Sequence, residues 1–268
     1  MRRHWIDLTT RDAATLQEGT VAVLPVAAVE QHGPHLPLGT DAFINRGMIA
    51  RFLELLPDDV PAVILPEQTV GASAEHLDFA GSLALSPGRL IETWTDIIAC
   101  AARAGVKRFL IFNSHGGQSG FLAHVALDLR VRLGLFVAYA AWFDAGYPVG
   151  MFSDEEIAYG MHGGAIETSL MLHLHPGLVR LDEIADFRPS THDIEAVARQ
   201  FSANPGNGRL GGFGWKAQDL QRSGVTGNAA AATAENGRLL LDHVASRLVE
   251  LVSDLGKADD FVTRYASA

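Results

Sequence analysis

Short apolar runs alternate along the chain with longer segments in which apolar residues recur at helical spacing. The short runs have the length of buried strands and lie at residues 20–26, 61–66, 107–113 and 135–141. The longer segments predict helices at residues 10–18, 41–56, 88–105, 118–133, 165–174 and 231–255. This alternation favours a single α/β domain over residues 1–268, with a mostly parallel sheet covered by helices on both faces. Residues 180–230 are polar and glycine-rich, and their weak periodicity predicts no element.

The loop after the first predicted strand is dense in residue types that bind metals. From Glu30 to Asp41 it holds two carboxylates and two imidazoles, and its glycines and prolines exclude regular structure. Glu30 and His32 lie two apart, so in extended backbone their side chains leave the same face. We interpret this stretch as a metal-binding loop. The alternative is structural, with Glu30 a solvated acid, His32 a turn residue and Asp41 a helix N-cap.

Three further candidates follow later elements. His115 comes between a predicted strand and two glycines, which leave the backbone free to present the ring, although the residue could instead cap the next helix. Glu167 lies in the first turn of a predicted helix, where the helix dipole alone favours an acid. His162 just precedes that helix and is a candidate general acid toward a leaving nitrogen. Because ligands of such folds lie beyond the carboxyl ends of the strands, we expect His115 and Glu167 to meet the loop residues at one rim.

The chemistry of these side chains indicates a hydrolytic metal site. Imidazole and carboxylate donors without sulfur suit zinc, manganese or iron. Two adjacent ions are reasonable because a carboxylate such as Asp41 can bridge them. Such a pair generates a hydroxide near neutral pH and polarises a carbonyl, which predicts hydrolysis of an amide-like bond. No organic cofactor is expected, since the glycines at residues 211–214 and 224–227 do not follow a strand as a dinucleotide fingerprint requires.

Three other polar positions have open or supporting roles. Glu75 and His76 lie in a long irregular segment at residues 67–86, and the pattern leaves both substrate binding and a structural role open for them. His35 is expected to support the ligands without binding an ion itself.

Cys100 is the only cysteine, so a disulfide framework and a thiolate metal site are excluded, and its apolar surroundings predict a buried thiol.

Charge and hydropathy restrict the classes of partner and the location expected for the protein. The formal net charge of -10 argues against nucleic acid and anionic membranes, which call for clustered Lys and Arg. No apolar run approaches the roughly 18 residues needed to span a bilayer, and the first residues lack the apolar core of a signal peptide. The simplest account of these features is a soluble cytoplasmic protein. The metal chemistry above adds the expectation of a small-molecule substrate.

Several motifs along the chain match one known family. They are residues 30–37 with Thr40 and Asp41, residues 113–117, His162 with residues 167–169, residues 71–76 with Gly81 and Ser82, and residues 224–227 with 232–235. Together they resemble the creatininase (creatinine amidohydrolase) family. The resemblance runs from about residue 20 to about residue 238. It implies a three-layer α/β/α fold, two divalent metal ions with zinc the leading candidate, and a homo-oligomer, hexameric in creatininase itself. It also implies hydrolysis of non-peptide or cyclic amide bonds.

The resemblance assigns roles by position. Glu30 and His115 would hold one metal, His32 the other, and Asp41 would bridge them. His162 would match the catalytic histidine of the family, and we take His162 and Glu167 as the candidate catalytic residues.

Two departures from the family motif affect these assignments. Creatininase proper has a glutamate two residues after the histidine matched by His115, and that glutamate binds the second metal; here Gly117 stands there. Glu167 is the candidate to replace this ligand. Gln118 replaces the asparagine usual after two glycines, so the substrate need not be creatinine.

Members of the family differ in substrate, and two classes of function are open for this chain. They include formamide-cleaving deformylases, a peptidase-like maturation enzyme for a redox cofactor and a hydrolase of oxidised inositols. We expect a metal-dependent hydrolase. The alternative is a catalytically silent, metal-stabilised assembly or small-molecule-binding protein.

Overall fold

The central sheet is parallel and holds four strands in the order β2-β1-β3-β4. A computed structural model describes residues 2–198, 200–203 and 210–258. The strands are β1 (Val21–Val26), β2 (Ala62–Ile64), β3 (Arg108–Asn113) and β4 (Phe136–Ala141). They confirm the four strands predicted from the apolar runs. Because Val26 pairs with Asn113 at the last position of β1 and β3, these two strands end at the same edge of the sheet.

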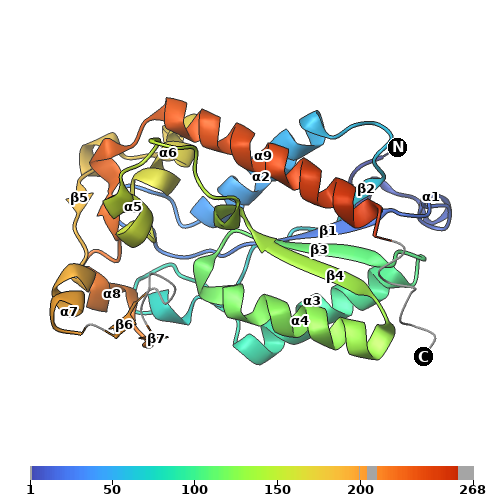
Figure 1. The fold of residues 1–268 in the computed structure, drawn as a ribbon, viewed down its shortest axis with the longest axis horizontal. Helices are drawn as coiled ribbons and strands as arrows, with labels where there is room; N and C mark the ends of the chain where they lie inside the picture. The colour runs from blue at the N-terminus through green and yellow to red at the C-terminus, as the bar shows by residue number, and fades with distance from the viewer. Residues whose placement is uncertain (1, 199, 204–209, 259–268) are drawn as a thin grey trace.

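Five long helices cover the two faces of this sheet (Figure 1). They are α2 (Thr40–Leu55), α6 (Ala165–Leu174) and α9 (Ala234–Gly256) on one face, and α3 (Pro87–Ala102) and α4 (Ser119–Leu133) on the other. Successive side chains of β1 enter opposite cores, because side chains alternate along a strand: Val23 packs with the first set of helices and Leu24 with the second. The three-layer α/β/α prediction is confirmed. The extent of the domain over residues 1–268 stays a prediction.

Shorter elements complete the described chain. The remaining helices are α1 (Thr10–Ala13), α5 (Asp154–Tyr159), α7 (Thr191–Val197) and α8 (Ala217–Leu220). The 3-10 turns lie at Trp5–Asp7, Ala74–His76, Gly116–Gln118, Trp142–Ala145, Pro176–Leu178, Leu181–Glu183 and Ala229–Ala231. Within the described ranges, no helix has the length and hydropathy required to cross a membrane.

Residues 180–230, for which the pattern predicted no element, form a set of small elements. β5 (Asp186–Phe187) pairs antiparallel with β8 (Gly227–Asn228), and β6 (Phe201–Ser202) pairs parallel with β7 (Gly211–Gly212). In Figure 1, β5, β6 and β7 lie with α7 and α8 at the end of the molecule farthest from both termini. Two-residue strands are too short to produce a hydrophobic period, which explains why the sequence pattern missed them.

Two local expectations were wrong. The first helix ends at Ala13 instead of residue 18, because the chain turns after it and Thr20 N–H donates to the carbonyl of Gln17. Cys100 is exposed and not buried. It lies two residues after the buried Ile98, about 200° around α3 at 100° per residue, and therefore on the outer side of that helix.

Candidate metal centre

The loop after β1 folds back on itself and brings its two ends together. Glu30 N–H donates to the carbonyl of Leu38 at 2.9 Å, so the start of the loop lies beside the start of α2. Gly33 turns the chain at a φ of +73°, and a Cβ there would lie 2.1 Å from Cγ2 of Val225, so glycine is required. Asp41 in the first turn of α2 thereby comes next to the residues that follow β1.

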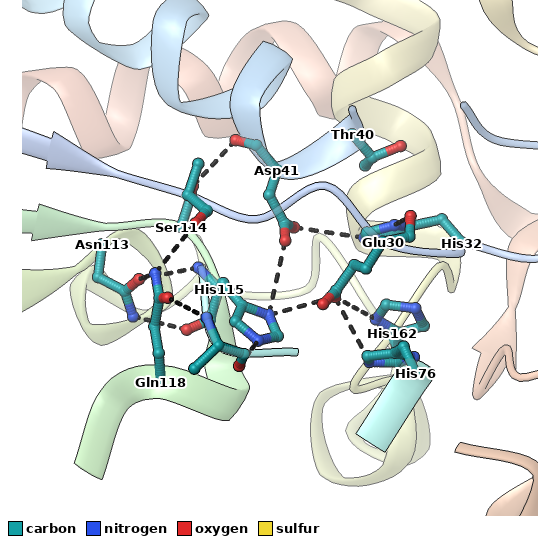
Figure 2. Close-up of polar contacts among 12 residues, drawn as sticks. Glu30, His32, Thr40, Asp41, His76, Asn113, Ser114, His115, Gln118 and His162 are labelled. Carbon is teal, nitrogen blue, oxygen red and sulfur yellow. Dashed lines mark hydrogen bonds and ion pairs between the residues drawn. The ribbon is translucent and has the colours of Figure 1, made fainter. Parts of the chain in front are cut away.

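Four of the predicted ligands meet at this edge of the sheet (Figure 2). His115 Nδ1 lies 3.2 Å from Glu30 Oε1 and 3.5 Å from Asp41 Oδ2. The other oxygen of Asp41, Oδ1, lies 3.3 Å from His32 Nε2. All four side chains are almost fully buried. The carboxylate of Asp41 therefore lies between the two histidines, with one oxygen facing each ring.

Glu167 is the fifth predicted ligand and joins the cluster from α6. Its Oε2 lies 3.8 Å from His32 Nε2 and also accepts the N–H of Gly163 at 2.6 Å. The carboxylate thus faces the cluster and at the same time binds the backbone before its own helix. This geometry is compatible with both interpretations of Glu167, metal ligand and helix-capping acid.

These side chains form two groups that share Asp41. The ligand atoms of Glu30, Asp41 and His115 lie within 4.8 Å of one another, and so do those of His32, Asp41 and Glu167. His162 forms a similar group with Glu30 and His32. Each group offers the oxygen and nitrogen donors that divalent transition metals accept.

Several donor atoms of the cluster have no hydrogen-bond partner. Both carboxylate oxygens of Glu30, Nε2 of His32 and Oδ2 of Asp41 are buried and make no hydrogen bond. Leaving a buried polar group unpaired costs on the order of 1–3 kcal/mol, and more for a charged group. Such atoms cluster where an ion can satisfy them together, so the residues present fit a pair of divalent ions.

Protonation would hold this cluster together without ions. Burial opposes a charge on His32, but the carboxylate of Asp41 beside it raises the pKa of His32 to about 9. Burial likewise opposes a charge on His115, yet Glu30 raises the pKa of His115 well above its ordinary value. Burial raises the pKa of Glu167 to about 7. Because metal ligands must lose their protons to bind an ion, ions and protons would compete for these groups.

The loop that presents His115 is held by two buried amides. Asn113 receives the N–H of His115 on Oδ1 at 3.0 Å and donates from Nδ2 to the His115 carbonyl at 2.7 Å. Gln118 Nε2 in turn donates to Asn113 Oδ1 at 2.8 Å and to the carbonyl of Ala27 at 3.3 Å. Gln118, which departs from the family motif, therefore ties the His115 loop to the residue after β1.

Glu75 and His76, left open by the sequence, both belong to the site. His76 Nε2 lies 3.4 Å from Glu30 Oε1. Glu75 Oε1 lies 3.4 Å from His115 Nε2, on the side of the ring away from Glu30. His35 Nε2 lies 3.0 Å from the carbonyl of Gly163, next to His162, and its supporting role stays a prediction.

Gln31 was missed as a site residue. Its side-chain nitrogen lies 2.8 Å from Nδ1 of His76 and 3.2 Å from Nε2 of His162. Its position between Glu30 and His32 was the only signal in the sequence, and an amide carries none of the charge that marks a metal ligand.

One known family matches nearly the whole chain. The Creatininase family, described as creatinine amidohydrolase, matches residues 6–252. The chain belongs to the creatininase family. This confirms the resemblance on which the residue assignments rest. The assigned roles of the individual residues stay predictions.

Two relatives of this creatininase-family protein differ in what their names say they act on. Creatinine amidohydrolase of Pseudomonas putida is 28% identical over 256 residues, which cover 87% of this chain and 89% of the relative. Mycofactocin precursor peptide peptidase of Mycolicibacterium smegmatis is 32% identical over 166 residues, covering 61% and 62% of the two chains. Both names denote hydrolases, and one of them denotes a hydrolase of a peptide.

Solved creatininase structures share the fold. One described as creatininase Mn has a TM-score of 0.77 at 24% identity, covering 95% of this chain and 98% of its own. A mutant creatininase described as Zn-Zn type has a TM-score of 0.76 at 25% identity, with the same coverage.

Proposed function

We propose that the protein is a metal-dependent hydrolase that cleaves a small cyclic amide, a formamide or a related non-peptide C–N bond. The observation that carries this proposal is the pair of ligand groups sharing Asp41, with several buried oxygen and nitrogen atoms that make no hydrogen bond. Glu30, Asp41 and His115 would hold one ion, and His32, Asp41 and Glu167 the other. When bound, such ions lower the pKa of a water and polarise a carbonyl.

Zinc is the first candidate for both ions. Imidazole and carboxylate donors suit it, and a related creatininase is described as a Zn-Zn type. Manganese and iron accept the same donors, and another related structure is described as a manganese form. Metal analysis of the purified protein decides among them.

His162 is proposed as the residue that moves the proton. Its Nδ1 lies 3.7 Å from Glu30 Oε1, at the edge of the cluster. Burial lowers the pKa of His162 well below its ordinary value, so the ring is neutral and able to accept a proton. In the reaction a water oxygen bonds to the carbonyl carbon, its proton passes to His162, and that proton reaches the leaving nitrogen as the C–N bond breaks.

The choice of a small non-peptide substrate rests on the family. The name creatinine amidohydrolase supports an amide, and the name of the peptidase relative makes a short peptide the competing substrate. We further propose that the protein is cytoplasmic and forms a homo-oligomer, a hexamer by resemblance. Light scattering of the purified protein would test the oligomeric state.

The decisive experiment measures metal content and turnover on the same preparation. Cyclic amides, formamides and short peptides are offered to the protein before and after chelation and after zinc or manganese is restored. We expect turnover to require metal and to be lost in His32→Ala. His124→Ala is the matched control, because this exposed histidine lies on the outer side of α4. Tight metal binding without turnover of any compound would favour the catalytically silent alternative.

A further inference from the structure

The side-chain amide of Gln31 has a fixed orientation. Its Oε1 lies 2.9 Å from the N–H of Gly33, which can only donate, and its Nε2 lies 2.9 Å from the carbonyl of Gly224, which can only accept. The nitrogen and oxygen ends of the amide are therefore assigned by their backbone partners. Gly224 has a φ of +79°, and a Cβ there would lie 2.5 Å from Gln31 Nε2, so the backbone encloses the amide closely. Gln31 cannot turn over without losing both bonds.

This orientation determines which nitrogen of His76 carries the proton. Gln31 Nε2 lies 2.8 Å from His76 Nδ1. Because the amide nitrogen is a donor, His76 Nδ1 must accept, and the proton of the neutral ring is on Nε2. Nε2 lies 3.4 Å from Glu30 Oε1 and 4.0 Å from Glu75 Oε1. His76 therefore turns an N–H toward the metal cluster.

The backbone carbonyl of Gln31 fixes the ring of His162. This ring turns Nδ1, and not Nε2, toward the cluster. His162 Nε2 lies 2.6 Å from the carbonyl oxygen of Gln31. A carbonyl only accepts, so Nε2 carries the proton, and Nδ1 faces Glu30 Oε1 at 3.7 Å with a free lone pair. The contact between His162 Nε2 and Gln31 Nε2 at 3.2 Å then joins two donors and is not a hydrogen bond.

The rings of His76 and His162 stack on each other, and both face the carboxylate of Glu30 (Figure 2). Their centroids are 4.3 Å apart and their planes are tilted by 26°. Figure 2 shows both rings facing the carboxylate of Glu30. Two neighbouring histidines thus present different atoms to the same site: His76 an N–H and His162 a lone pair.

We propose that Gln31 is a positioning residue that makes His76 and His162 present opposite atoms to the metal cluster, so that His162 is the only one of the two able to accept a proton there. His76 in this arrangement donates toward Glu30 and keeps that carboxylate in place. The role of His162 as proton acceptor in hydrolysis rests on the proposed function. The positions of the ring protons can be observed without any substrate.

Nitrogen-15 NMR of the metal-loaded protein tests the ring protons directly. Histidine ring nitrogens with and without a proton give different shifts, and spectra of His76→Asn and His162→Asn assign the two rings. We expect a proton on Nε2 of both His76 and His162. A proton on Nδ1 of either ring overturns the proposal.

Substitution of Gln31 distinguishes the effect of its side-chain amide from the effect of its backbone carbonyl. Gln31→Met removes the amide but keeps the carbonyl, so the His76 signals should change while His162 keeps its proton on Nε2. Loss of an outer partner of a metal site typically costs 10- to 100-fold in activity, and we expect kcat of Gln31→Met to fall by about that factor with little change in KM.

One control variant and a separate measurement of turnover keep the outcomes distinct. Gln68→Met removes a glutamine amide whose Nε2 bonds to the carbonyl of Pro66, and it should leave the His76 and His162 signals unchanged. Unchanged His76 signals in Gln31→Met would overturn the proposal. The expected ring protons in a protein that hydrolyses none of the compounds would uphold the positioning role and refute the proposed hydrolysis, so the two failures can be told apart.

Discussion

The carboxylate of Glu75 fills the space beside the Cα of Gly117. A Cβ at position 117 would lie 1.8 Å from Glu75 Oε1 and 2.7 Å from His115 Nε2. His115 Nε2 donates to the carbonyl of Ala72 at 3.0 Å, with Glu75 Oε1 3.4 Å away as a second acceptor. The missing side chain at position 117 thus lets a loop from another part of the chain place an acid behind a candidate metal ligand. Such partners fix the tautomer and orientation of a ligating histidine.

This arrangement predicts strong coupling between positions 75 and 117. Gly117→Ala should displace the Glu75 carboxylate and destabilise the protein, whereas the same substitution in a Glu75→Ala background should cost less. Contacting residues typically show coupling of about 0.5–3 kcal/mol. Denaturant unfolding of the four proteins of this cycle measures the coupling.

The neighbouring glycine supplies the control for this cycle. A Cβ on Gly116 would meet no atom within 4 Å, so Gly116→Ala and Glu75→Ala should act additively. Additive free energies for positions 75 and 117 would mean that Glu75 does not occupy the space beside Gly117.

A second prediction concerns Glu167 as the replacement ligand. Glu167→Gln keeps an oxygen that can accept the N–H of Gly163 but removes the negative charge near His32. We expect the protein to remain folded and to lose one of its two ions, as measured by elemental analysis after gel filtration. Glu183→Gln, at an exposed position outside the cluster, is the control. Full occupancy of both ions in Glu167→Gln would leave Glu167 a helix-capping or substrate-binding residue.

The fold could be predicted because its central strands β1 and β3 are buried on both faces. Every residue of β1 and β3 is buried, which forces continuous apolar runs that differ from the spaced pattern of the helices. The elements of residues 180–230 depend instead on contacts with other parts of the chain. Val225, for example, is fully buried because it packs beside Gly33, and no local period in its own segment signals this.

The site was predictable where residue type and strand end coincided. Glu30 and His32 lie in the loop after β1 and His115 in the loop after β3, and parallel strands bring their carboxyl ends together. The contacts of Gln31 depend on the direction of its side-chain amide, and those of Glu75 depend on the space beside Gly117. The direction of an amide and the gap left by a glycine appear only when distant segments are placed against each other.

Metal binding should strengthen as pH rises. Without metal the pKa of His32 is about 9, above its ordinary 6.5, so below about 9 a proton must leave before an ion can bind. Each released proton adds about tenfold to the apparent affinity per pH unit in this range. Calorimetry of zinc binding in buffers of different ionisation enthalpy should detect proton release that declines toward pH 9. Binding without proton release would contradict the protonated state of His32.

The stability of the metal-free protein should change with pH in the opposite direction. A raised pKa of His32 contributes stability that is fully present below its unfolded value of about 6.5 and lost as pH rises through about 9. Thermal unfolding of the metal-free and metal-loaded forms should therefore show a widening gap in Tm between these pH values. A constant gap would mean that His32 does not exchange its proton for an ion.

The contact between α6 and α9 limits how far Glu167 can move. A Cβ on Gly237 of α9 would lie 1.9 Å from the carbonyl oxygen of Ser169 in α6. Backbone atoms cannot rotate away as a side chain can, so Gly237→Ala must push the two helices apart. Overpacking of this kind typically costs about 1–3 kcal/mol, and we expect a lower Tm together with weaker binding of the ion near Glu167.

Gly120→Ala in α4 provides the matched comparison, since a Cβ there would meet no atom within 4 Å. Alanine favours a helix over glycine by up to about 1 kcal/mol, so this variant should raise Tm and leave metal binding unchanged. A stabilised Gly237→Ala would show that α6 and α9 can separate freely. In that case Glu167 would owe its position to its hydrogen bond with Gly163 and not to the helix packing behind it.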